Sequence, residues 1–395
     1  MNRTDRLFAL TDQHRAKNFL PLPVMAAEAQ GVWVEAVDGT KYMDMIAGYG
    51  ALNQGHCHPQ IVEALKLQAT RSALLSDAVY NDQQGRLYEK LSALTRKDLV
   101  FLANTGAEAI EAAVKVARRW GYRVKGVPSG CAEILVSEGN FHGRTTTAVS
   151  FSTDGSVRAD FGPYTPGFRT VPFGDADALE RAVTPNTVAF LTEPIQGKGI
   201  RVAPKGFLRD AQDVCRRNKV LFVADEVQTG FGRTGRRFCC DWEEVAPDIY
   251  VLGKALGGGT YPVSAIAANV EVLSVLEPGS HGTTYGANAL ACAVAFAALD
   301  VVEREGLAQR ALELGTYFLD RLRALHSPVV REVRGLGLFV GLELGSAIEP
   351  YCESLREHGI LCKGAGMNTI RLTPPLVITR DELDWALAQL TKVLV

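Results

Sequence analysis

Residues 249–259 read IYVLGKALGGG and join a short apolar run to a lysine and a cluster of glycines. A run of four apolar residues without alternation is typical of a strand that is buried on both faces of a sheet. Lys254 follows this run among small residues that leave its amine open. Such a lysine becomes a nucleophile when burial or a neighbouring cation lowers its pKa from about 10.4. An ordinary surface lysine is the alternative, so the rest of the sequence must decide its role.

Apolar runs of the same kind recur along the chain. Helical patterns separate several of them, notably at residues 107–122 and 207–218. Buried strands that alternate with helices indicate an α/β fold with a mainly parallel sheet covered by helices. Including residues 249–252, we expect seven strands in this sheet, and the others are residues 99–102, 133–136, 168–171, 189–192, 221–224 and 264–268.

The pattern changes after about residue 290, where helices come before strands. This order is typical of a small α+β domain. The elements we expect in it are helices at 289–305 and 308–325, strands at 329–333, 337–343 and 369–372, and a closing helix.

Near the start of the chain, residues 31–44 predict a β-hairpin around Asp38-Gly39. We expect this N-terminal segment, residues 1–45, to pack with the small domain. The predicted large domain then covers residues 46–285, and the small domain covers residues 286–395.

The chain has 395 residues, of which 47% are hydrophobic and 22% are charged, as in a globular protein of two or three domains. Its net charge of −2 gives no overall reason to expect nucleic acid or an anionic membrane as a partner. The eight cysteines are scattered without a C-x-x-C pair, which favours reduced thiols. The sequence shows no signal-peptide pattern and no apolar run of membrane-spanning length, so we expect a cytoplasmic protein.

Residues 103–108 (ANTGAE) follow the first strand of the predicted sheet and precede a helix. The free N–H groups and the dipole of a helix start can bind phosphate, Gly106 allows the backbone to approach closely, and Thr105 adds a hydroxyl. The same residues also fit a simple helix cap, with Thr105 as N-cap and Glu108 completing a capping box. This segment alone leaves both interpretations open.

Residues 221–230 (LFVADEVQTG) place Asp225 at the end of a buried strand. A carboxylate is costly there unless it pairs with a metal, a cation or a protonated ring nitrogen. Just beyond, residues 230–235 (GFGRTG) match the pattern G-x-G-x-x-G. No strand comes directly before this match and no helix follows it, so we exclude a dinucleotide-binding motif and expect a loop.

A phosphate cradle, Asp225 and Lys254 together match the needs of pyridoxal 5'-phosphate. The lysine would form the Schiff base, and the aspartate would keep the pyridine nitrogen protonated so that the ring withdraws electrons. His56-Cys57-His58 has side chains that can bind a metal, but no second pair of such ligands stands out. We therefore expect no metal.

Longer motifs point in the same direction. They are YGALNQGHCHP (49–59), NTGAEAIEAAVKVARRWGY (104–122), GNFHGRT (139–145), TEPIQG (192–197), ADEVQTGFGRTG (224–235), PDIYVLGKALGGGTYPVSA (247–265), PGSHGTTYGANALACAVA (278–295) and IRLTPPLVI (370–378). With these motifs the chain, from about residue 18 to residue 395, resembles the class III (subgroup II) pyridoxal-phosphate aminotransferases, and among them the ornithine aminotransferases most closely. The resemblance implies fold type I and a homodimer, or a higher oligomer, with shared active sites.

The resemblance also implies roles for residues around the cofactor. Lys254 would form the Schiff base and move a proton, and Asp225 would pair with the pyridine nitrogen. Gln228 would lie near the phenolic oxygen, Phe141 would stack on the ring, and Thr284 would reach the phosphate in the neighbouring subunit. The other implied cofactor-binding residues are Thr105, Gly106 and Ala107 at the phosphate, together with His142 and Glu193.

For the substrates, the resemblance implies two arginines with different tasks. Arg144 would hold the carboxylate of an ornithine-like amino acid whose α-amino group meets Tyr49, and Tyr80 would line the pocket. Arg371 would hold the carboxylate of glutamate or 2-oxoglutarate, since arginine binds carboxylates with two parallel hydrogen bonds. The implied reaction moves the δ-amino group to 2-oxoglutarate and gives glutamate and glutamate semialdehyde, which cyclises to pyrroline carboxylate.

One position departs from the family pattern. The motif E-P-I-Q-G-E normally ends in a glutamate that masks the second arginine, whereas this chain has Lys198 there and is one residue shorter just after it. If Lys198 lies beside Arg371, the arginine stays open, and an α-transaminase, racemase or epimerase becomes the alternative function. If Lys198 points to solvent instead, another group masks Arg371. A non-catalytic binding protein on the same fold is a further rival.

Overall fold

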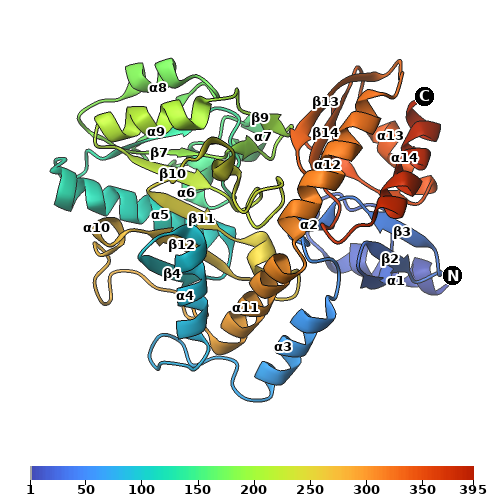
Figure 1. Ribbon diagram of the computed structural model, residues 1–395, viewed down its shortest axis with the longest axis horizontal. Helices are drawn as coiled ribbons and strands as arrows, with labels where there is room; N and C mark the ends of the chain where they lie inside the picture. Colours follow the sequence, from blue (N-terminus) through green and yellow to red (C-terminus); the bar gives the residue numbers. More distant parts are fainter. Residues whose placement is uncertain (1) are drawn as a thin grey trace.

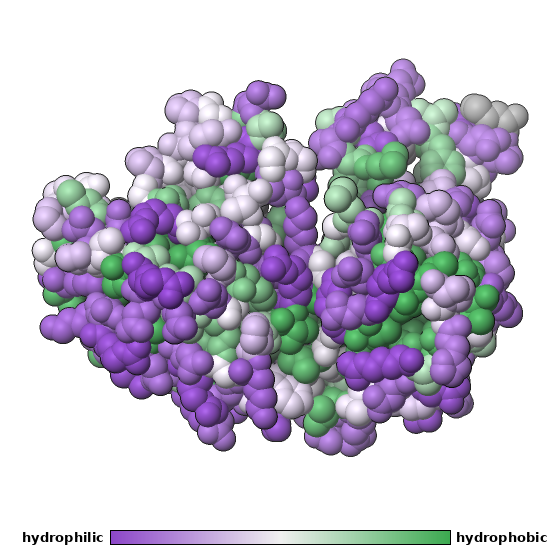
Figure 2. Space-filling model, turned by 90° about the horizontal axis from the view of Figure 1, so that it is seen from above, coloured by the Kyte–Doolittle hydropathy of each residue, from purple (hydrophilic) through white to green (hydrophobic). Residues whose placement is uncertain are grey.

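A computed structural model describes residues 2–395, which form two lobes (Figure 1). Seen from above, a notch separates the lobes (Figure 2). The larger lobe is built on a seven-stranded sheet whose strands are the seven that the sequence predicts. In spatial order they are β4 (Leu99–Ala103), β12 (Ser264–Ala268), β11 (Ile249–Leu252), β10 (Leu221–Asp225), β7 (Thr187–Thr192), β5 (Glu133–Ser137) and β6 (Phe168–Val171).

Six of these strands run in one direction and β12 alone runs antiparallel to both of its neighbours. The prediction of a mainly parallel α/β sheet is therefore confirmed. Every residue of β7, β10, β11 and β12 is buried, which explains why these strands read as unbroken apolar runs.

Helices cover both faces of this sheet. In β10, Leu221 and Val223 face the cluster that includes α5, whereas Phe222 and Ala224 face the cluster that includes α9. Helices α4 and α11 cover the second face near β4 and β12. The helices and turns of this lobe are α3 (Pro59–Ala69), α4 (Gln84–Thr95), α5 (Gly106–Trp120), η1 (Gly121–Lys125), α6 (Thr146–Ser150), α7 (Gly155–Arg158), α8 (Ala176–Ala182), α9 (Phe207–Arg217), η2 (Cys239–Glu243), η3 (Lys254–Gly257), α10 (Val270–Leu273) and α11 (Ala289–Arg304), with a two-stranded ribbon of β8 (Ile195–Gln196) and β9 (Arg201–Val202).

The smaller lobe contains an antiparallel sheet with helices packed on it, as predicted for the end of the chain. Its strands lie in the order β13 (Val330–Leu336), β14 (Phe339–Leu344), β17 (Thr369–Leu372) and β16 (Lys363–Gly364). Its helices are α12 (Leu307–Arg323), α13 (Glu349–Glu357) and α14 (Arg380–Leu394). Within residues 2–395, no helix is long and apolar enough to cross a membrane.

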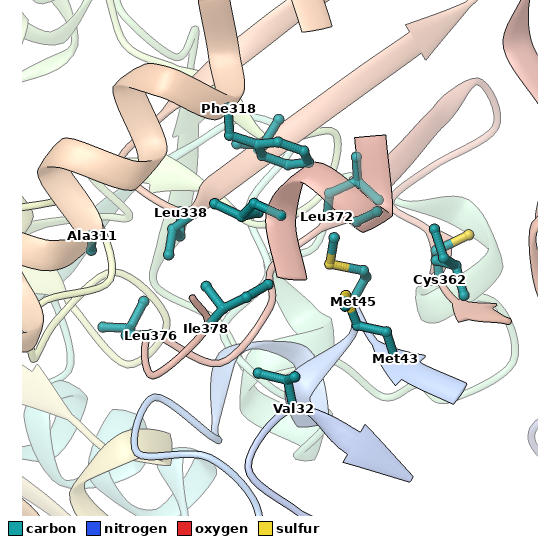
Figure 3. Packing of buried hydrophobic residues seen from close by; sticks show 14 of the residues in the cluster. Val32, Met43, Met45, Ala311, Phe318, Leu338, Cys362, Leu372, Leu376 and Ile378 are labelled. Atoms are coloured by element: carbon teal, nitrogen blue, oxygen red, sulfur yellow. The ribbon is translucent and has the colours of Figure 1, made fainter. Parts of the chain in front are cut away.

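The N-terminal segment joins the smaller lobe. Strands β2 (Trp33–Ala36) and β3 (Lys41–Asp44) form the predicted hairpin, with β1 (Ala26–Gln30) on one side and β15 (Ile360–Leu361) on the other, after helix α1 (Arg3–His14). Val32, Met43 and Met45 share one buried cluster with Leu372 and Cys362 of the C-terminal part (Figure 3). The exact domain limits, after residues 45 and 285, stay a prediction.

The packing of α12 yields a test of this arrangement. A Cβ at the buried Gly315 would lie 2.2 Å from the carbonyl carbon of Gly337. Helix propensity favours alanine over glycine by about 1 kcal/mol, but overpacking costs about 1–3 kcal/mol, and the contact here is with backbone. We predict that Gly315→Ala lowers the free energy of unfolding in urea by about 1–2 kcal/mol.

The matched control is Gly85→Ala in α4, where nothing lies within 4 Å of an added Cβ. This exposed helical site should be neutral or slightly stabilised. Equal effects of the two substitutions would contradict the close contact between α12 and Gly337.

Candidate active site

A cavity of about 180 Å³ lies where the carboxyl ends of β10 and β11 meet the start of α5. Parallel strands bring their carboxyl ends to one edge of a sheet, so loops far apart in sequence converge there. The cavity is lined by Gly106, Ala107, Ile110, Phe141, His142, Gly143, Glu193, Ile195, Asp225, Val227, Gln228 and Lys254.

At one end of the cavity lies the start of α5. Thr105 is the N-cap, its Oγ1 accepts a hydrogen bond from the Glu108 N–H, and the Glu108 carboxylate accepts from the N–H groups of Asn104 and Thr105. The capping box is therefore confirmed. It leaves the N–H groups of Gly106 and Ala107, the first two helical residues, without an acceptor inside the helix, so the cap and an anion cradle coexist.

Asp225 closes β10 and is buried. Its Oδ1 accepts a hydrogen bond from the Val227 N–H, and its Oδ2 lies 2.7 Å from Nδ1 of the buried His142. Burial alone would lower the pKa of His142, but the hydrogen bond and charge of Asp225, with the charge of Glu193, outweigh it and raise that pKa. Asp225 and His142 thus form a buried, hydrogen-bonded pair on one side of the cavity. The other ring nitrogen of His142, Nε2, is buried and has no hydrogen-bond partner.

Glu193 joins two loops at the edge of the cavity. Its carboxylate accepts hydrogen bonds from the N–H groups of Phe141 (2.9 Å) and Gly197 (3.0 Å). Burial raises the pKa of Glu193, whereas the charge of His142 acts in the opposite direction. Glu193 was expected from the resemblance as a cofactor-binding residue, and the structure shows that it also fixes the backbone beneath Phe141.

Lys254 begins the short turn η3, and one residue separates it from the end of β11. Its backbone is left-handed, with φ +45°, which is uncommon outside glycine and marks a constrained position. Burial and the charge of Arg371 lower the pKa of Lys254 to about 8, while Asp225 and Glu193 act against them. A large share of the amine is therefore neutral near pH 8, which a nucleophile requires.

Tyr49 enters the site from the junction between the lobes. Gln228, which lines the cavity, donates a hydrogen bond from Nε2 to the Tyr49 carbonyl oxygen at 2.7 Å. The guanidinium of Arg371 lies 5.2 Å from the centre of the Tyr49 ring. Burial raises the pKa of the Tyr49 hydroxyl, and the charges of Arg371 and Arg144 oppose this rise.

Arg371 extends from β17 and is held at one end. Its Nη2 donates a hydrogen bond to the Gly197 carbonyl oxygen at 2.8 Å, whereas its buried Nε has no partner. Burial lowers the pKa of Arg371 to about 10. Among residues 2–395, no carboxylate forms a salt bridge with Arg371, so its charge is available to a carboxylate ligand.

Lys198 does not act on Arg371. Its ammonium forms a salt bridge with Asp154, and its side chain is partly exposed. The pair lowers the pKa of Asp154 to about 2, with the hydrogen bond from Lys198 as the largest cause. Of the two positions considered for Lys198, the structure supports the one away from Arg371, because a carboxylate 44 residues earlier pairs with the ammonium.

Five expected residues lie at the surface of this chain, among them Thr105 and Arg144, and Arg144 does not line the cavity. Phe141 borders the cavity and is 43% exposed, whereas Tyr80 is 97% exposed and Thr284 is also exposed. Neither Tyr80 nor Thr284 lines the cavity of its own chain. Tyr80, which was expected to line the pocket, does not line it in this chain, since its segment runs across the surface between α3 and α4.

The G-x-G-x-x-G match forms a loop, as expected, but its arginine has a structural task that the sequence did not reveal. Arg233 is wholly buried and donates hydrogen bonds to Asn53 Oδ1 and to the carbonyl oxygens of Leu338 and Pro374. It therefore ties the larger lobe to the smaller one. Within residues 2–395, no three His, Cys, Asp or Glu side chains gather in a way that could hold a metal ion.

Comparison with known proteins gives the family. The model of the class III aminotransferases matches residues 14–394. Similar relatives include the ornithine aminotransferase of Brevibacillus brevis (55% identical, covering 100% of this chain and 99% of the relative) and that of Bacillus subtilis (52%, covering 100% and 98%). The chain belongs to the class III aminotransferases and is an aminotransferase.

Comparison with solved structures gives the same family. The ornithine aminotransferase of Toxoplasma gondii ME49 matches with a TM-score of 0.98 at 41% identity, covering 100% of this chain and 95% of that one. The acetylornithine aminotransferase of Elizabethkingia anophelis matches with a TM-score of 0.92 at 45% identity, covering 100% and 99%. The predicted fold of the family is thus confirmed.

The surroundings of Lys254 predict how its reactivity depends on pH. Only the neutral amine reacts with an aldehyde or an acylating reagent, so labelling of Lys254 in cofactor-free protein should rise with pH to a midpoint near 8. Asp225→Asn removes a charge that raises this pKa and should move the midpoint down. Arg371→Met removes a charge that lowers it and should move the midpoint up.

Peptide mass spectrometry measures the labelled fraction at each pH. The exposed Lys41, which forms a surface pair with Glu35, serves as the internal control in the same digest. A Lys254 midpoint equal to that of Lys41, or shifts of the same sign in both variants, would contradict the electrostatic account.

Proposed function

We propose that the cavity binds pyridoxal 5'-phosphate. The support is the combination of groups in one place: the open amides of Gly106 and Ala107 for an anion, and Asp225 and Lys254 at the ends of adjacent strands. The unpartnered Nε2 of His142 and the exposed face of Phe141 border the same space. These residues fit a flat, phosphorylated pyridine aldehyde better than a metal or a dinucleotide.

When bound, this cofactor supplies an electron sink that stabilises negative charge on the carbon bearing the amino group. Asp225, held by the Val227 N–H and by His142, is the residue that would keep the pyridine nitrogen protonated. Lys254 Nζ would take the proton from the substrate carbon and return it, because it is neutral above about pH 8. Phe141 would cover the ring and limit the access of water.

We propose further that the amino donor is ornithine, whose δ-amino group reacts, and that the acceptor is 2-oxoglutarate. Relatives named ornithine aminotransferase at 52–55% identity over the whole chain support this choice. The observation that carries it is the position of Tyr49, whose ring lies 5.2 Å from the guanidinium of Arg371 beside the cavity. Tyr49 and Arg144 would hold the α-amino and α-carboxylate groups of ornithine, so that its far end points to Lys254.

The same pocket would orient the second substrate in another way. Arg371 would bind the α-carboxylate of 2-oxoglutarate or glutamate, which brings the α-carbon rather than the δ-carbon to Lys254. Two carboxylate clamps at different distances thus give one cavity two regiochemistries. Arg371 has no carboxylate partner among residues 2–395, so the preference for ornithine over an α-transaminase or racemase rests on the relatives named ornithine aminotransferase.

We infer that the active form is a homodimer. Tyr80, Thr284 and Tyr285 are exposed in one chain, as are Leu74, Leu75 and Val79, and a second copy would cover them. Thr284 would then reach the partner's phosphate site. Sedimentation should give twice the mass of one chain, and Thr284→Ala should weaken cofactor binding without changing that mass; a monomer with full activity would contradict the proposal.

The experiment that tests the function is incubation with L-ornithine and 2-oxoglutarate, followed by product identification. We predict pyrroline carboxylate and glutamate in equal amounts, and loss of more than about a thousandfold in kcat for Lys254→Ala. Formation of the 2-oxo acid of ornithine, or of D-ornithine, would instead support reaction at the α-carbon and overturn the proposal.

Substitutions of Arg144 and Arg371 should each affect the KM of a different substrate. Arg144→Leu should raise KM for ornithine about tenfold to a hundredfold and leave KM for 2-oxoglutarate nearly unchanged, because a lost charged hydrogen bond costs about 1.5–3 kcal/mol. Arg371→Leu should do the reverse. Steady-state kinetics with each substrate varied checks both, and equal effects on both substrates would contradict the division of tasks.

A further inference from the structure

Tyr49 sits on a left-handed turn. The four consecutive residues of α2 (Ala47–Gly50) have φ values of +46°, +58°, +61° and +82°. Gly48 and Gly50 adopt this conformation freely, but Ala47 and Tyr49 carry a Cβ, and a left-handed residue of that kind costs roughly 1–2 kcal/mol. A turn like this persists only where its surroundings hold it in place.

Asp44, the last residue of β3, holds this turn in its conformation. Its Oδ1 accepts hydrogen bonds from the N–H groups of Ile46 (2.8 Å) and Ala47 (2.9 Å), which are the two peptide groups that lead into the turn. Its Oδ2 lies 2.8 Å from Nε2 of His56. Asp44 is buried and His56 is largely buried, so this pair is shielded from water.

His56 is itself fixed by the backbone. Its N–H and carbonyl groups exchange hydrogen bonds with Gly31 across an isolated bridge. A Cβ on the neighbouring Gly55 would lie 2.8 Å from Val377, so the chain is tightly enclosed there. The imidazole therefore reaches Asp44 from a position with little freedom to move.

The far side of the turn is tied to the substrate arginine. The Thr373 N–H donates to the Met45 carbonyl oxygen at 2.8 Å, and Thr373 Oγ1 donates to that of Ile46 at 3.0 Å. Thr373 comes two residues after Arg371. Asp44 and Thr373 thus hold the same short stretch of chain from two directions, and that stretch carries the ring that lies against Arg371.

We propose that Asp44 and His56 form a positioning pair for Tyr49, and through it for the amino acid substrate. The inference rests on the proposed function in assigning Tyr49 to the substrate. His56 belongs to the His-Cys-His triplet whose side chains could have suggested a metal. The two histidines of the triplet have different partners, because His56 pairs with Asp44 and His58 pairs with Glu305 at the end of α11.

The test uses two amide variants that differ by one methylene group. The His56→Gln side chain is long enough to place a donor near the position of Nε2, whereas the His56→Asn side chain is too short. We expect His56→Asn to raise KM for ornithine about tenfold to a hundredfold with a smaller change in kcat, since displacement of a positioning group by 1 Å has effects of this size. His56→Gln should restore most of the loss.

His58→Ala is the matched control. It removes a neighbouring histidine with a carboxylate partner of its own, so it should change stability without changing KM for ornithine. A rise in KM equal to that of His56→Asn would overturn the proposal, and so would an unchanged KM in His56→Asn.

A double-mutant cycle separates positioning from general damage. In a Tyr49→Ala background, His56→Asn should cause no further rise in KM for ornithine, because the group that it positions is gone. Additive effects would overturn the proposal. Unchanged cofactor absorbance in each variant shows that the protein is folded and loaded.

A crystal structure of His56→Asn gives a readout that does not depend on the substrate. The proposal predicts that Tyr49 leaves its left-handed conformation or becomes disordered, and an unchanged turn would overturn it. If the wild-type protein does not use ornithine, the proposed function fails, and this structural readout still decides the positioning claim.

Discussion

Lys254 is half-buried where it lines the cavity, and the electrostatics of the site follow from its partial removal from water. A buried amine loses its proton readily, and the charges of Arg371 and Arg233 add to this, so that the pKa falls to about 8. Asp225 and Glu193 limit the fall, and each is secured in turn by His142 or by backbone N–H groups. The positions of Asp225, Glu193 and His142 around the lysine are therefore set by loops that meet at the carboxyl ends of the strands.

The second constraint is the strained turn at the junction of the lobes. The larger lobe provides the cavity, but Tyr49 and Arg371 come from the N-terminal and C-terminal segments that meet in one buried cluster (Figure 3). Arg233 and Asn53 join the lobes through a fully buried set of hydrogen bonds. Substrate groups are thus aligned with Lys254 by contacts that lie well away from the reacting atoms.

Much of the fold and of the cofactor site could be predicted from the sequence, because the patterns that indicate them lie within short stretches of the chain. Nearly continuous apolar runs predicted the seven strands of the sheet, and the residues at the end of β10 and just after β11 gave Asp225 and Lys254. Thr105 and Glu108 predicted the capping box for the same reason. After residue 286, the sequence pattern predicted α11, α12, β13, β14, β17 and α14 in the right order, but it did not predict α13, β15 or β16.

The failures concern pairs that are distant in sequence or in different chains. Lys198 meets Asp154 because two loops approach each other, which no local pattern records. The pairing of His56 with Asp44 likewise joins residues 12 apart in the sequence, and no local pattern predicted it. Tyr80 is exposed in one chain, and in the proposed dimer a second copy would cover it.

The central claim is that Lys254 is the amine that binds the cofactor. Reduction of the purified enzyme with borohydride, followed by digestion and peptide mass mapping, tests it directly. The account predicts a pyridoxyl phosphate group on Lys254 and on no other lysine. The same group on a different lysine, or a protein that carries none after incubation with the cofactor, would contradict it.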